Sequence, residues 1–127
     1  MSGRPTVPHY PHPAIIEGYG RGGFRFAGMS HRGSLLCLPS GIWAWEATRA
    51  EDVDEAGLAR VFDEAQAIDL FLLGLGNARV VPQDALRQRF HAAGIALEAM
   101  RTGEAANTYN ILLEERRRVA CGLIAVP

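Results

Sequence analysis

The hydrophobic positions follow two different periods along the chain, and the change falls near residue 50. Before it, short apolar runs such as Phe24-Arg25-Phe26 are separated by glycine clusters. This pattern predicts short antiparallel strands joined as hairpins or a meander. The expected strands cover residues 14–19, 24–26, 34–38 and 42–45.

After residue 50 the apolar spacing becomes helical. One helix face is predicted by positions spaced i, i+3, i+4 and i+7, namely Leu58, Val61, Phe62 and Ala65. Asp52 or Asp54 could cap the start of this helix.

The remainder alternates strands with helices. The continuous apolar run 70–73 is typical of a strand covered on both faces. A helix from about Pro82 to Gly94 follows, then a strand at 95–97, a helix capped by Thr102 that ends near residue 115, and a strand at 119–126.

This order predicts an α/β fold: a central mixed, largely parallel sheet with helices on both faces and an additional N-terminal antiparallel β-meander. Four of the seven prolines (Pro5, Pro8, Pro11 and Pro13) lie in the first thirteen residues. We therefore expect residues 1–13 to form a flexible proline-rich arm and residues 14–127 a single domain.

The composition argues against several classes of function. Of the 127 residues 48% are hydrophobic and 21% charged, and the net charge is −1, so a nucleic-acid partner is not expected. No apolar run is long enough for a transmembrane segment, and no leader pattern is visible, so a cytoplasmic location is expected. All 13 basic residues are arginine, which excludes lysine-based catalysis.

Residues suited to catalysis or metal binding are sparse. Cys37 and Cys121 lie among apolar residues and are predicted to be reduced core thiols. His9 and His12 have no cysteine or carboxylate near them. We therefore expect no metal, no cofactor and no enzymatic activity.

The Gly74-Leu75-Gly76 segment follows the predicted buried strand, and Asn77 comes next. A glycine pair there lets a ligand approach the backbone, as in dinucleotide folds. The third glycine position of that motif is Arg79, however, and the next helix begins too late to meet a pyrophosphate. A tight strand-exit turn is the alternative.

The third helix carries a second unusual feature, the run Asn107-Thr108-Tyr109-Asn110. Asn and Thr are poor helix formers because their side chains compete for backbone hydrogen bonds. Thr108 and Asn110 could line a cleft with Gly74, Gly76 and Asn77, or they could satisfy neighbouring backbone groups.

An ordered set of segments resembles an uncharacterised-domain family that includes the mitochondrial NADH dehydrogenase (complex I) assembly factor 3 and small archaeal and bacterial proteins. The segments are 16–19, 23–28, 33–39, Trp45, 74–76 and 108–110 followed by Leu112.

The resemblance implies a three-layer α/β fold and no catalytic residues. It also implies protein partners among respiratory or inner-membrane assembly components, and a position at the periphery of the inner membrane. The chain departs from the mitochondrial members by lacking a transit peptide and by having Leu75 where a small hydroxyl residue is common.

Two hypotheses follow. The first is a non-catalytic protein-interaction domain that acts like an assembly factor. The second is a small-molecule or nucleotide-binding protein that uses the Gly74-Leu75-Gly76 turn.

Overall fold

The computed structural model describes residues 7–78 and 81–127 and contains two β-sheets. The smaller sheet is an antiparallel meander, which confirms the predicted N-terminal β-meander. Its strands are β1 (Ile16–Gly20), β2 (Gly23–Phe26) and β3 (Met29–Arg32). The third strand was not predicted, and the strands predicted at 34–38 and 42–45 belong to the larger sheet.

The larger sheet is mixed, with strand order β5-β4-β8-β6-β7. Its strands are β4 (Ser34–Leu38), β5 (Gly41–Trp45), β6 (Leu70–Gly74), β7 (Ala96–Met100) and β8 (Val119–Leu123). β6 runs parallel to β7 and β8, whereas β4 runs antiparallel to β5 and β8. The parallel part is confined to three strands, because β4 and β5 are joined as a hairpin rather than by a helical crossover.

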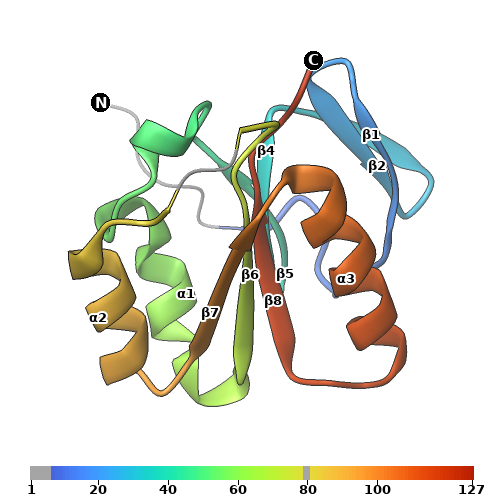
Figure 1. Ribbon diagram of the computed structural model, residues 1–127. Helices are drawn as coiled ribbons and strands as arrows, with labels where there is room; N and C mark the ends of the chain where they lie inside the picture. The colour runs from blue at the N-terminus through green and yellow to red at the C-terminus, as the bar shows by residue number, and fades with distance from the viewer. Residues whose placement is uncertain (1–6, 79–80) are drawn as a thin grey trace.

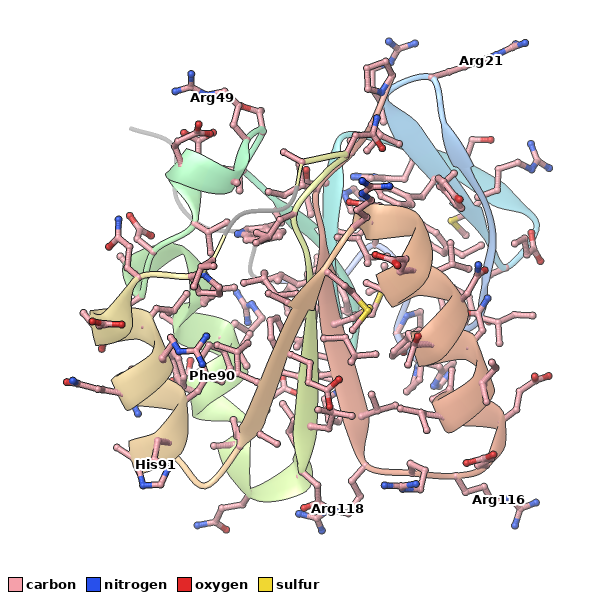
Figure 2. The ribbon with its side chains drawn as sticks, viewed as in Figure 1. Arg21, Arg49, Phe90, His91, Arg116 and Arg118 are labelled. Atoms are coloured by element: carbon pink, nitrogen blue, oxygen red, sulfur yellow. The ribbon has the colours of Figure 1, made fainter. Side chains whose placement is uncertain are left out.

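Helices cover both faces of the larger sheet (Figure 1). On one face lie α1 (Ala59–Asp63) and α2 (Asp84–Ala92), as Figure 1 shows. Phe90 of α2, labelled in Figure 2, stacks there on the Phe71 ring, with centroids 5.2 Å apart. On the other face lies α3 (Thr102–Glu114), whose buried Tyr109 belongs to a second apolar cluster. The predicted three-layer α/β fold is thereby confirmed.

The helix predicted around Leu58–Ala65 is broken into short pieces. One-turn 3₁₀ segments at Ala50–Asp52, Ala56–Leu58 and Ala65–Ala67 flank α1. Leu58 and Val61 are buried as their spacing predicts. Of the two expected caps, Asp52 is wrong, because its carboxylate accepts hydrogen bonds from Thr48 and the Arg49 N–H. Asp54 does bind the start of the segment that leads into α1, because its Oδ1 accepts from the Gly57 N–H, three residues on, at 2.8 Å.

Residues 7–13 of the proline-rich segment lie against strand β5. The His9 N–H donates to the Ile42 carbonyl at 2.8 Å, and the Ile42 N–H donates to the Tyr10 carbonyl at 2.9 Å. The flexibility of residues 1–13 stays a prediction, since residues 1–6 lie outside the described part of the chain.

The segment after β8 joins the two sheets. The Ile124 N–H donates to the Gly74 carbonyl at 2.9 Å, and the Ala125 N–H donates to the Ser34 hydroxyl at 2.9 Å. The Gly22 N–H, in the β1–β2 turn, donates to the Val126 carbonyl at 2.7 Å. These three bonds fix the meander relative to the larger sheet. Within residues 7–78 and 81–127, no helix is long and apolar enough to cross a membrane.

Replacing Gly74 by alanine is expected to destabilise the fold by about 1–3 kcal/mol, the usual cost of overpacking. An added Cβ would lie 2.9 Å from the Thr102 Cα and 3.1 Å from the Ala105 Cβ, so α3 would have to move. Gly18→Ala is the control, because a Cβ there meets only the Arg25 Cδ, at 4.0 Å. Chemical denaturation measures both changes, and equal losses would contradict the packing argument.

Candidate functional site

The glycine turn after β6 is held by the first residue of α3. The Gly76 N–H donates to the Thr102 hydroxyl at 2.9 Å, and this hydroxyl donates to the Ile124 carbonyl at 2.7 Å. The Thr102 N–H donates to the Gly76 carbonyl at 2.9 Å. Thr102 therefore bridges β6, α3 and the segment after β8, and its side chain is fully buried.

This arrangement corrects the predicted role of Thr102. The N-cap of α3 is Arg101, and Thr102 is the first helical residue. Its hydroxyl points to the ends of β6 and β8, because its partners Gly76 and Ile124 follow those two strands. Gly76 has a φ of 78°, which fits the predicted tight turn.

The predicted cleft residues are not all brought together. Gly74 and Gly76 meet the start of α3, and Asn77 follows them as an exposed residue. Thr108 and Asn110 lie further along α3, with Asn110 about 12 Å along the helix axis from Thr102 at 1.5 Å per residue. A ligand site that includes all five residues stays a prediction.

Asn110 forms a two-point contact with β1. Its Oδ1 accepts from the Ile16 N–H at 2.8 Å, and its Nδ2 donates to the Ile16 carbonyl at 2.8 Å. Of the two roles considered for this side chain, the satisfaction of neighbouring backbone groups is the one that the structure contains. The contact attaches the meander to α3.

The two cysteines face each other across strands β4 and β8. Both are buried and reduced, which confirms the prediction of core thiols. Burial raises the pKa of the Cys121 thiol well above its usual range, so it stays protonated at neutral pH and is a poor nucleophile. Over the described ranges, no three His, Cys, Asp or Glu side chains gather as a metal site.

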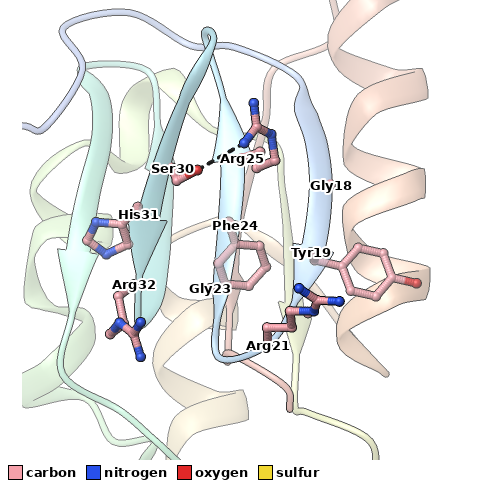
Figure 3. Close-up of a pocket in the computed structure, with 10 residues that line it drawn as sticks. Gly18, Tyr19, Arg21, Gly23, Phe24, Arg25, Ser30, His31 and Arg32 are labelled. Atoms are coloured by element: carbon pink, nitrogen blue, oxygen red, sulfur yellow. Dashed lines mark hydrogen bonds between the residues drawn. The ribbon is translucent and has the colours of Figure 1, made fainter.

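A groove with a volume of about 600 Å³ lies on the three-stranded sheet and was not predicted from the sequence (Figure 3). Gly18, Gly20 and Gly23 line it, and so do three arginines, Arg21, Arg25 and Arg32. The remaining lining residues are Tyr19, Phe24, Ser30 and His31.

The register of the meander explains this composition. Gly18 pairs with Arg25, which pairs with Ser30, and Gly20 pairs with Gly23, which pairs with Arg32. Paired residues and residues two apart share one face of a sheet, so these six lie together. The opposite face presents Phe24 and Phe26 to the core.

The arginines of the groove carry no ion pair to any carboxylate that the structure describes. The Arg25 Nη1 donates to the Ser30 hydroxyl at 3.1 Å, as Figure 3 shows. Arg21 has a φ of 53°, a left-handed conformation that costs a non-glycine residue roughly 1–2 kcal/mol. Burial, together with the nearby His9, lowers the pKa of His31, so His31 is more readily neutral than an exposed histidine.

A second hollow, of about 700 Å³, lies beside Trp45 and is lined by Asp52 and Asp54. Both carboxylates already accept backbone hydrogen bonds, from Thr48 and Gly57 respectively. This occupancy leaves the groove on the meander as the stronger candidate for binding an external charged group.

The chain belongs to the family described as a protein of unknown function (DUF498/DUF598), which matches residues 16–124. It is 37% identical over 123 residues to an uncharacterized protein of Rhodobacter capsulatus, covering 97% of this chain and 94% of that one. The resemblance to this family is thereby confirmed.

A second relative is NADH dehydrogenase [ubiquinone] 1 alpha subcomplex assembly factor 3 of Drosophila melanogaster. The two are 31% identical over 115 residues, which cover 87% of this chain but 58% of the fly protein. The fold matches the crystal structure of an outer membrane protein from Bartonella henselae, with a TM-score of 0.91, 41% identity, and coverage of 94% of this chain and 100% of that one.

Replacing Thr102 by valine should cost about 3 kcal/mol, because two buried backbone groups each lose a partner worth roughly 1–3 kcal/mol. The shape is retained, so packing changes little. Thr102→Ser keeps the hydroxyl and should cost only about 1 kcal/mol for the lost methyl group. Urea unfolding of both variants measures the difference, and a valine variant as stable as the serine variant would exclude the bridging role.

Asn110→Ala should lower the free energy of unfolding by about 1–3 kcal/mol, because both backbone groups of Ile16 lose their partner. Asn107→Ala is the matched control, since Asn107 is exposed on the same helix. Equilibrium denaturation of the pair tests the contact. If Asn110→Ala were as stable as the control, Asn110 would be available to line an open cleft.

Proposed function

We propose that this chain is a non-catalytic interaction domain that assists assembly of a respiratory or membrane protein complex. The observation that carries the proposal is the match, over most of the chain, to proteins named as assembly factors. Because the chain spans 58% of the fly protein and 64% of the mouse protein, the partners are part of the proposal.

The geometry supports an interaction role in a second way. Of the side chains first considered as a ligand site, Asn110 binds both backbone groups of Ile16. The backbone N–H of Gly76, another of those residues, donates to the Thr102 hydroxyl. The groove on the meander instead offers outward-facing guanidinium groups, which suit recognition of an external partner. The proposal includes a cytoplasmic location at the periphery of the inner membrane.

An affinity pull-down tests the proposal. The full chain, tagged at its N-terminus, is captured from gently solubilised membranes and from the cytosolic fraction of its own organism. Enrichment of NADH dehydrogenase or inner-membrane subunits by at least fivefold over a tagged unrelated domain of similar size is the expected outcome, read by mass spectrometry. Recovery of the chain alone from both fractions would contradict it.

That contrary outcome would favour the alternative, a small-molecule or nucleotide site at the Gly74-Leu75-Gly76 turn. Thermal unfolding with nucleotides, flavins and phosphate separates the two functions. A ligand present at one hundred times its Kd would add about 2.7 kcal/mol of stability, whereas the interaction proposal expects no shift from these compounds.

A further inference from the structure

We propose that the groove on the three-stranded sheet binds an acidic segment of a partner protein, with Arg21, Arg25 and Arg32 as its recognition residues. This inference rests on the proposed function, because it names the chemistry of the partner that the interaction domain would recognise. It adds a site and a ligand class to that function.

The distribution of charged residues along the chain makes the groove positively charged. Residues 1–45 contain four of the 13 arginines but only one of the 14 acidic residues, Glu17. The Oε1 of Glu17 accepts from the Gly28 N–H at 3.4 Å, at the β2–β3 turn. The other thirteen acidic residues lie in the part of the chain that builds most of the larger sheet and its helices. The meander is therefore locally basic on a molecule whose net charge is −1, and a negative ligand is attracted to this face.

The shape of the groove favours a narrow ligand. Its glycines carry no side chains, so the sheet backbone is exposed between the flanking arginines. Arg25 and Arg32 project from neighbouring strands on one face, and Arg21 stands at the β1–β2 turn (Figure 3). An extended polypeptide could lie across this surface and present side-chain carboxylates to all three guanidinium groups.

The chemistry of the lining favours carboxylates. A guanidinium group is a planar fork whose two N–H donors match the two oxygens of a carboxylate. Binding of single-stranded nucleic acid would call for aromatic rings on which bases stack. Phe24, however, is only 2% exposed. Tyr19 is 49% exposed, but it shares the face of Phe24, opposite Arg25 and Arg32, and its hydroxyl lies against Gly103 of α3. A bilayer surface is broad, whereas the arginines here surround a concavity.

A fluorescein-labelled dodecapeptide of alternating Glu and Ser tests the proposal, with a Gln-Ser peptide as the neutral control. Fluorescence anisotropy measures binding of each peptide to the full chain. The double variant Arg25→Gln/Arg32→Gln should weaken binding of the acidic peptide at least tenfold. Arg87→Gln is the control for charge, because Arg87 is exposed on α2, on the far side of the larger sheet (Figure 1). It should change the Kd by less than twofold.

Gly18→Leu tests occupancy of the groove without changing charge. An added Cβ at Gly18 meets only the Arg25 Cδ, at 4.0 Å, so a leucine there would fill the floor of the groove with little strain. It should weaken peptide binding at least fivefold while the thermal unfolding midpoint stays within a few degrees of the parent. Unchanged affinity in a folded Gly18→Leu variant would overturn the proposal.

Three further outcomes would also overturn it. Equal weakening by Arg87→Gln and by the double variant would mean that the peptide senses only overall charge. Tighter binding to phosphatidylserine vesicles or to an oligodeoxythymidine of twelve nucleotides, lost in the double variant, would assign the groove to a lipid surface or a nucleic acid. If the double variant still captured the same partners in the pull-down, the assembly function would stand while the groove inference failed.

Discussion

The short segment after β8 is the constraint on which the relative placement of the two sheets depends. Residues 124–126 exchange hydrogen bonds with the exit of β6, with Thr102 at the start of α3, with Ser34 at the start of β4 and with the β1–β2 turn. Thr102 and Ser34 are the buried polar side chains of the described structure, and each binds this segment. An unpaired buried polar group costs free energy. A shift of the segment would leave such groups unpaired, so these hydrogen bonds hold it in one position.

Close packing reinforces this constraint. The Thr102 Cα and the Ala105 Cβ lie where a Cβ of residue 74 would stand. Because Gly74 has no Cβ, α3 packs more closely on β6 than any other residue at position 74 would permit. α3 in turn holds the meander through Asn110 and Ile16. The glycine turn is therefore structural at both of its glycines: one allows close packing and the other a positive φ.

The sequence predicted the class of fold because its strongest signals were local. A continuous apolar run located β6, and the signals at the helix ends located α2 and α3. Gly94 marked the end of α2, where its φ is 75°. The role of Thr102 was not predictable, because its partners Gly76 and Ile124 lie 26 and 22 positions away. The broken helix around α1 was missed because spacing reports which face is buried and not how many turns remain hydrogen-bonded.

The groove was missed for a related reason. Its six outward-facing residues come from three strands, and only the register of the meander places them together. A signal was nevertheless present, because Arg21, Arg25 and Arg32 lie among glycines in a segment with one acidic residue. Core formation does not need those charges, since the opposite face of the sheet carries the buried Phe24 and Phe26. The left-handed φ of Arg21 belongs to the two-residue turn between β1 and β2. The buried polar groups of this fold bind one another, whereas the arginines of the groove have no carboxylate partner among the described residues. These arginines are therefore the groups available to a partner.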